Sequence, residues 1–282
     1  ERTRQRLADR GLLSRATLFC AGHERMAELA PPGADAIVFN LGWLPGAQHA
    51  VTTRVETTLA AVSQAVVLNM GAIEDLDAMI LAGQEAGRRG IPVVLDPVAA
   101  GASRLRRESC VKLLEQVPLT IVRGNASEIK ALAVGSSSTR GVDVGGADII
   151  TEETLPAAVQ MAQDLSRRLN AVVAISGVID VVALDGRAVW LRNGCAEMSR
   201  ITGSGCMLTS LIGAFCGAMP SDPFAAVCAA MAAMGVCGEI ADSLRLAKGT
   251  GNATFRTDLI DAVFNLTEKQ LTEGVRYEIY QG

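Results

Sequence analysis

Short apolar runs alternate with segments of helical periodicity along the chain. The apolar runs are rich in Val, Ile and Leu, and they predict strands at 16–20, 35–41, 65–70, 92–96, 119–123, 171–176, 180–184 and 188–192. The segments between them carry apolar residues at helical spacing and predict helices near 54–64, 73–89, 104–116, 126–133 and 153–169. This alternation is typical of an α/β fold with a mostly parallel central sheet and helices on both faces. Ligands in such folds bind beyond the carboxyl ends of the strands.

Three stretches refine this picture of a single α/β domain over residues 1–282. DVVALDGRAVWLR (180–192) predicts a hairpin that turns at Asp185 and Gly186, and therefore an antiparallel edge on the sheet. The Gly- and Ser-rich residues 135–148 predict a surface loop and not a domain linker. The apolar stretch 206–241 is broken at residues 220–223, which favours two buried helices over a membrane span.

Composition excludes several classes of function. Hydrophobic residues make up 49% of the chain and aromatic residues only 4%, so the core must be built from Ala and aliphatic side chains, as in buried parallel strands. With a net charge of -4, the chain has no excess of basic residues that would favour binding to nucleic acid or to a membrane surface. Seven scattered cysteines without a CxxC pair favour reduced thiols in a cytoplasmic protein. With His23 and His49 as the only histidines, a zinc site or a Ser-His-Asp hydrolase is disfavoured.

The segment ITGSGCMLTSLIGAF (201–215) is the strongest candidate for chemistry. Gly203 and Gly205 let the backbone approach a ligand closely, and the free N–H groups at the start of the following helix form an anion site suited to a phosphate in transfer. Cys206 falls in the first turn of that helix, where its thiol can face a substrate hydroxyl. The alternative is that Cys206 only packs in the core, as free cysteines usually do.

Polar side chains also follow three other predicted strands. Asp96 could hold Mg²⁺ or its waters, or it could only cap a turn. Arg123 could clamp a phosphate, and the chain is expected to turn directly after it. Asn125 in that turn and Glu128 in the first turn of the following helix could orient a hydrated Mg²⁺ or simply cap the helix. Ser176 places a small hydroxyl near a phosphate or ribose, although Ser-Gly is also ordinary turn chemistry.

The order and spacing of six motifs carry a family resemblance. They are NMGAIED (69–75), VVLDPVAAGAS (93–103), IVRGNASEI (121–129), ISGVIDVV (175–182), ITGSGCML (201–208) and GNATFRTDLIDAVFNL (251–266). Over about residues 63–275 the chain resembles the hydroxyethylthiazole kinases, thiamine-salvage enzymes of the ribokinase-like superfamily. Most kinases of that superfamily carry an aspartate after the Gly-rich turn, whereas the thiazole kinases carry a cysteine.

The resemblance implies a ribokinase-like fold and an ATP- and Mg²⁺-dependent reaction. The γ-phosphoryl group of ATP would pass to the primary alcohol of 4-methyl-5-(2-hydroxyethyl)thiazole, and the protein would form a homotrimer. Carried over position by position, the catalytic role falls on Cys206, the ATP contacts on Arg123, Ser176 and Asn125, a thiazole contact on Gly203, and the magnesium site on Asp96 and Glu128. Another ribokinase-like chemistry, such as that of an ATP-dependent hydrate dehydratase, is disfavoured because those enzymes use aspartate in place of Cys206.

Residues 1–62 depart from the thiazole kinase pattern. FNLGWLPG (39–46) and TRVETT (53–58) instead resemble part of a class I methyltransferase of the rRNA-methylase type. The S-adenosylmethionine-binding strand of such enzymes is missing, so we expect no methyltransferase activity. A natural fusion, a designed chimera and an assembly artefact all fit this pattern. Because the usual N-terminal substrate motif is absent, the alternative function is that of a catalytically impaired nucleotide-binding protein, unless Trp43 or Leu44 lines a substitute pocket.

Overall fold

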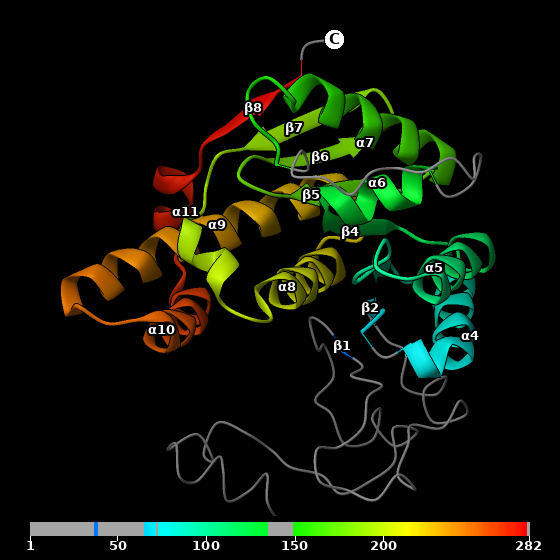
Figure 1. Cartoon of the computed structure of the whole chain (residues 1–282), viewed down its shortest axis with the longest axis horizontal. Coiled ribbons are helices and arrows are strands. Elements are labelled where there is room, and N and C mark those ends of the chain that lie inside the picture. The colour runs from blue at the N-terminus through cyan, green and yellow to red at the C-terminus, as the bar shows by residue number, and fades with distance from the viewer. Residues whose placement is uncertain (1–36, 39–64, 72, 135–148, 281–282) are drawn as a thin grey trace, which may run out of the picture.

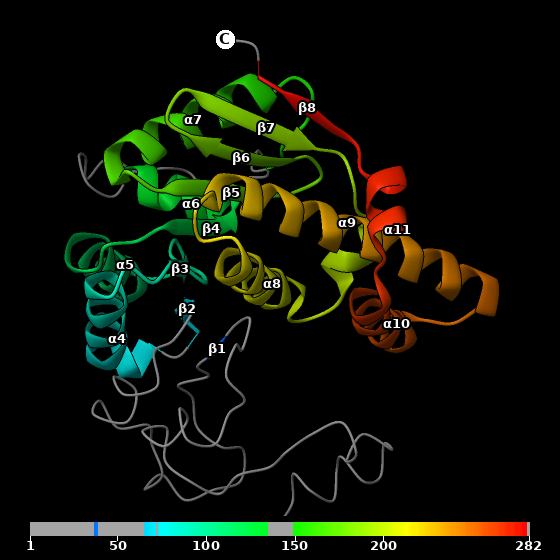
Figure 2. The same ribbon diagram turned by 180° about the vertical axis from the view of Figure 1, so that it is seen from behind.

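A sheet of eight strands organises the part of the chain that the computed structural model describes, which is residues 37–38, 65–71, 73–134 and 149–280. The strands lie in the sheet in the same order as in the sequence, and Figures 1 and 2 show helices on both sides of it. Neighbouring strands from β1 to β5 are parallel, and those from β5 to β8 are antiparallel. The strands are β1 (Ile37–Val38), β2 (Val66–Asn69), β3 (Val93–Asp96), β4 (Ile121–Asn125), β5 (Val172–Ser176), β6 (Asp180–Leu184), β7 (Arg187–Leu191) and β8 (Tyr277–Ile279).

The helices divide between the two faces. They are η3 (Ile73–Asp75), α4 (Leu76–Arg88), α5 (Arg104–Gln116), α6 (Ala126–Val134), α7 (Leu155–Leu169), η4 (Ala196–Arg200), α8 (Ser204–Ala218), α9 (Pro223–Lys248), α10 (Asn252–Asn265) and α11 (Glu268–Gly274). Helices α4 to α7 cover one face, and α8 to α10 lie against the other (Figures 1 and 2). The prediction of an α/β, ribokinase-like fold with a mostly parallel sheet is confirmed. Of the predicted elements, 16–20, 54–64 and most of 35–41 lie outside the described residues.

Alternate residues of the strands from β2 to β7 supply two separate cores. In β2, Val66 and Leu68 pack under α4, whereas Val67 faces the opposite layer with α8 and α9. Both faces are therefore covered by helices, which explains why the strands are continuous apolar runs and do not alternate with polar residues. The low aromatic content is compatible with this arrangement, because Ala, Val, Leu and Met fill most of the two clusters.

The antiparallel edge is larger than the sequence predicts. The hairpin between β6 and β7 turns at Asp185, whose φ of 53° is in the left-handed region, as expected. Strand β8 then pairs with β7 and forms the outer edge (Figure 1). Side-chain hydrogen bonds hold this C-terminal segment in place: Asn193 donates to the carbonyl of Gly274 at 2.9 Å and accepts from the Arg276 N–H at 2.7 Å.

The long apolar stretch forms two core helices, as predicted. Helix α8 ends at Ala218, and α9 begins at Pro223 after Asp222, whose side chain caps it by accepting from the backbone of Ala225 at 3.1 Å. By length and composition α9 could cross a membrane. However, 72% of its most apolar window is buried inside the fold, which is the position of a core helix.

Candidate active site

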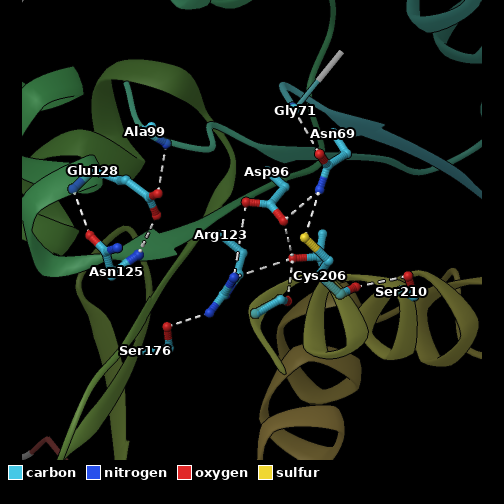
Figure 3. Close-up of polar contacts among 12 residues, drawn as sticks. Asn69, Gly71, Asp96, Ala99, Arg123, Asn125, Glu128, Ser176, Cys206 and Ser210 are labelled. Atoms are coloured by element: carbon cyan, nitrogen blue, oxygen red, sulfur yellow. Dashed lines mark hydrogen bonds and ion pairs between the residues drawn. The ribbon is translucent and has the colours of Figure 1, made fainter. Parts of the chain in front are cut away.

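The register of the parallel strands brings four polar side chains to one edge of the sheet. Asn69 at the end of β2 pairs with Asp96 at the end of β3, and Asn125 at the end of β4 pairs with Ser176 at the end of β5. The N-terminal turn of α8 lies close to these strand ends, as Figure 3 shows. The site therefore forms at the carboxyl edge of the sheet, where a ligand site was predicted.

Asp96 points into this site and not toward the turn that follows it. Its side chain is 1% exposed, and its Oδ2 accepts hydrogen bonds from Asn69 Nδ2 at 3.0 Å and from Thr209 Oγ1 at 2.9 Å. Its Oδ1 lies 3.9 Å from Nη1 of Arg123. Burial raises the pKa of Asp96, although the guanidinium and the two hydrogen bonds oppose that shift. The Glu128 carboxylate adds to the rise in the pKa of Asp96.

Arg123 is a buried cation beneath the start of α8. Its side chain donates to Ser176 Oγ and, at 3.5 Å, to Thr209 Oγ1, while its Nε has no partner among the described residues. The ATP contacts that the resemblance implies, Arg123 and Ser176, are thus in direct contact. A Cβ on Gly205 would lie 2.9 Å from Arg123 Nη1, so only a glycine there lets the helix come this close to the guanidinium.

The Gly-rich turn has the geometry expected for an anion site. Gly203 has a φ of 96° and precedes the first residue of α8, and the first intrahelical hydrogen bond runs from the Met207 N–H to the Gly203 carbonyl at 2.9 Å. The first N–H groups of a helix have no intrahelical acceptor, and they carry the positive end of the helix dipole. This positive end and the Arg123 guanidinium face the same region, so an anion there would be attracted by both.

Cys206 lies in the first turn of α8 with an exposed side chain. Its Sγ accepts a hydrogen bond from Asn69 Nδ2 at 3.3 Å. The alternative of a packing role is wrong, because the thiol faces the polar strand ends and is not part of the core. By contrast Cys110, Cys216 and Cys237 are buried, and burial raises the pKa of each of these thiols.

The predicted turn after Arg123 is wrong. Strand β4 continues through Gly124 and Asn125, since both residues pair with β5, and α6 follows at once. Asn125 Oδ1 caps the helix by accepting from the Glu128 N–H at 2.9 Å, and Glu128 Oε2 accepts from the Asn125 N–H at 2.9 Å. The other Glu128 oxygen accepts from the Ala99 N–H at 2.8 Å. Capping is therefore the role that the structure gives to these two side chains, and each carboxylate oxygen keeps a lone pair for a further partner.

Two residues of the site were missed by the sequence analysis. Asn69 bonds to both Asp96 and Cys206, and Thr209 is fully buried between Asp96 and Arg123. Asn69 could have been found, because it is the one polar residue near the carboxyl end of the strand predicted at 65–70. Thr209 gives no such signal, since a threonine inside an apolar helix usually bonds only to its own backbone.

Relatives of this chain, found by comparing sequences, carry one activity in their names. The family model for the hydroxyethylthiazole kinase family matches residues 46–269. A hydroxyethylthiazole kinase of Clostridium acetobutylicum is 43% identical over 215 residues, which cover 76% of this chain and 78% of that protein. The enzyme of that name from Thermoanaerobacter pseudethanolicus is 40% identical over 245 residues, covering 86% and 88% respectively.

A solved structure supports the same relationship. The hydroxyethylthiazole kinase protein of Pyrococcus horikoshii superposes with a TM-score of 0.67 at 26% identity, covering 80% of this chain and 81% of that one. The family match, the identity of the relatives and the shared fold agree with the resemblance carried by the six motifs. The chain belongs to the hydroxyethylthiazole kinase family.

Proposed function

We propose that this site phosphorylates the primary alcohol of 4-methyl-5-(2-hydroxyethyl)thiazole with ATP, a step in thiamine salvage. A kinase that acts on an alcohol group is what the family membership supports. The observation that carries the assignment of the site is the buried Arg123 guanidinium under the N-terminal turn of α8, next to the exposed thiol of Cys206.

The anion site would stabilise the phosphoryl group in transfer. Arg123 and the N–H groups that begin α8 supply fixed positive partial charge to the γ-phosphoryl oxygens, and Ser176 holds the guanidinium from the opposite side. Fixed donors of this kind typically contribute about 3–4 kcal/mol each to transition-state stability. Gly203 would lie beside the thiazole, and a glycine at this position can adopt the left-handed φ that the turn has there. Asn125 lies beside Ser176 and is assigned to the nucleotide side of the site.

Cys206 would act on the substrate hydroxyl. The alcohol oxygen attacks the γ-phosphorus, the bond from that phosphorus to the β,γ-bridging oxygen breaks, and ADP leaves. Cys206 Sγ would orient the hydroxyl and, as the thiolate, take up its proton as the new P–O bond forms, which leaves the neutral thiol. Most of the rate enhancement in such reactions comes from positioning and electrostatics, which this rigid set of strand ends provides.

Asp96 and Glu128 fit the magnesium ion that the family implies. Both are carboxylates, which Mg²⁺ prefers, and they lie close enough to interact electrostatically. Among the described residues no three His, Cys, Asp or Glu side chains gather to hold a metal by themselves. This donor set suits an ion that takes its remaining ligands from water and from nucleotide phosphates. When bound, the ion neutralises charge on the transferring phosphate.

The test combines binding and turnover. We expect isothermal titration to show binding of an ATP analogue with Mg²⁺ and then of hydroxyethylthiazole, and Cys206→Ala to lower kcat by about 100-fold or more while the analogue still binds. Nucleotide binding without thiazole binding would instead favour the catalytically impaired alternative. Light scattering of the same sample tests the homotrimer, and cell fractionation tests the cytoplasmic location. Both stay predictions, as do the absence of nucleic-acid and membrane partners.

A further inference from the structure

Both amide hydrogens and the carbonyl oxygen of the Asn69 side chain have hydrogen-bond partners. Its Oδ1 accepts from the Gly71 N–H at 2.9 Å, and its Nδ2 donates to Asp96 Oδ2 at 3.0 Å and to Cys206 Sγ at 3.3 Å (Figure 3). A backbone N–H can only donate, so the atom that faces Gly71 must be the amide oxygen. The two amide hydrogens are thereby directed at the carboxylate and at the thiol.

The chain around Asn69 is built to fix this orientation. Its position in β2 pairs with Asp96 in β3, which sets the distance between the two side chains. At Gly71, a Cβ would lie 2.8 Å from Asn69 Oδ1, closer than a side chain can approach. A side chain at position 71 would therefore push the amide out of this position. No other amide side chain in the described residues donates to Cys206.

We propose that Asn69 is a positioning residue for phosphoryl transfer, because it holds the Cys206 thiol in register with the Asp96 carboxylate. The proposal rests on the function assigned above to Cys206. An exposed cysteine can occupy three staggered rotamers, and the hydrogen bond from Asn69 selects one of them. The same amide restrains Asp96, so the thiol and the carboxylate keep one separation. Asn69 acts on the alcohol side of the site and makes no hydrogen bond to Arg123 or Ser176.

The test is a double-mutant cycle in the full-length protein. Asn69→Leu keeps the approximate size of the side chain and removes its hydrogen bonds. We expect kcat to fall by roughly 10- to 100-fold, as for other misplaced catalytic groups, and KM for ATP to stay within about threefold. In the Cys206→Ala background the same substitution should lower kcat much less, because the thiol that it positions is gone. Gly71→Ala should lower kcat in the same direction, since its Cβ displaces the amide without removing it.

Ser210→Ala is the matched control. Ser210 Oγ donates to the backbone carbonyl of Cys206 at 2.9 Å, so it touches the same residue but not the thiol, and its removal should leave kcat unchanged. Equal losses from Asn69→Leu in both backgrounds, or a loss seen only in KM for ATP, would overturn the positioning role. Full activity of Cys206→Ala would instead overturn the function assigned to the thiol and this inference with it. If Asn69→Leu does not fold, Gly71→Ala and its cycle with Cys206→Ala decide the question by the same criteria.

Discussion

The contact between Gly205 and Arg123 yields the sharpest prediction. In Gly205→Ala the new Cβ would lie 2.9 Å from Arg123 Nη1, 3.5 Å from Nη2 and 3.6 Å from Cζ. Arg123 as a residue is only 6% exposed, so its guanidinium has little room to move aside. It can retreat only by giving up its hydrogen bond to Ser176 or its approach to Asp96. We therefore expect the substitution to misplace the charge that we assign to nucleotide binding.

The size of the effect follows from the interaction lost. A hydrogen bond made by a charged group contributes about 1.5–3 kcal/mol, and each 1.4 kcal/mol corresponds to a factor of ten in affinity. Gly205→Ala should thus raise KM for ATP by roughly 10- to 150-fold. KM for the thiazole should change much less, because Cys206 and Asn69 hold the other side of the site. Steady-state kinetics with each substrate varied, and titration with an ATP analogue, measure both quantities.

Gly83→Ala provides a control for the steric part of the change. Gly83 lies in α4 on the opposite face of the sheet, and a Cβ there would lie 2.4 Å from Val117 Cγ1, so it introduces a more severe clash, against an apolar side chain and away from the site. We expect this variant to melt at a lower temperature and to keep its KM for ATP. If Gly205→Ala leaves KM for ATP within twofold of the original, or if Gly83→Ala raises it equally, the guanidinium does not bind the nucleotide as described.

Two further predictions concern stability. Burial raises the pKa of Asp180 to about 7, although the Gly177 N–H at 2.8 Å and Arg123 oppose the shift. The folded state therefore disfavours the carboxylate, and the protein loses stability from this group as the pH rises from about 4 to about 7. In urea unfolding, Asp180→Asn should be more stable than the original protein by about 1–2 kcal/mol at pH 8. At pH 4 the two proteins should be equally stable, and an equal gain at both pH values would contradict the argument. Phe255→Ala should lower the free energy of unfolding by about 3–5 kcal/mol, because Phe255 is completely buried. Ile260→Ala on the same helix should lower it by less than about 1 kcal/mol, because Ile260 is half exposed. Similar losses in the two variants would contradict this reasoning.

The central part of the fold could be predicted from the sequence because its signals are local. The run VVLD (93–96) is apolar, β-branched and ends in a polar residue, and each of these features is visible within a few positions. Strand β8 has no such signal. Its residues Tyr277, Glu278 and Ile279 are all exposed, and the segment is held by Asn193, which is more than 80 positions earlier in the chain. A strand whose place is set by pairing with the distant β7 and by a distant side chain cannot be found from periodicity.

The residues of the site divide in the same way into those with a local sequence signal and those without one. Asp96 and Ser176 were found because each ends a buried strand, and the glycines around Cys206 mark the start of a helix. Asn69 has the same strand-end signal, but its contact with Cys206, 137 positions away, does not show in the sequence, and Thr209 has no local signal for its contact with Asp96, 113 positions away. The turn after Arg123 was predicted wrongly because Gly-Asn is common turn chemistry, whereas here the pairing of β4 with β5 overrides that local preference.

Helix α8 links the two sides of the site. Cys206 in its first turn contacts Asn69 of β2, whereas Gly205 and Thr209 contact Arg123 of β4. Gly205, Cys206 and Thr209 all lie within the first two turns of this helix, so they cannot move independently. A shift of α8 along its axis would change the place of the thiol and the space for the guanidinium together. The alcohol and the nucleotide would then lose alignment at the same time, which means that the packing of this helix against the sheet is itself part of the proposed catalytic arrangement.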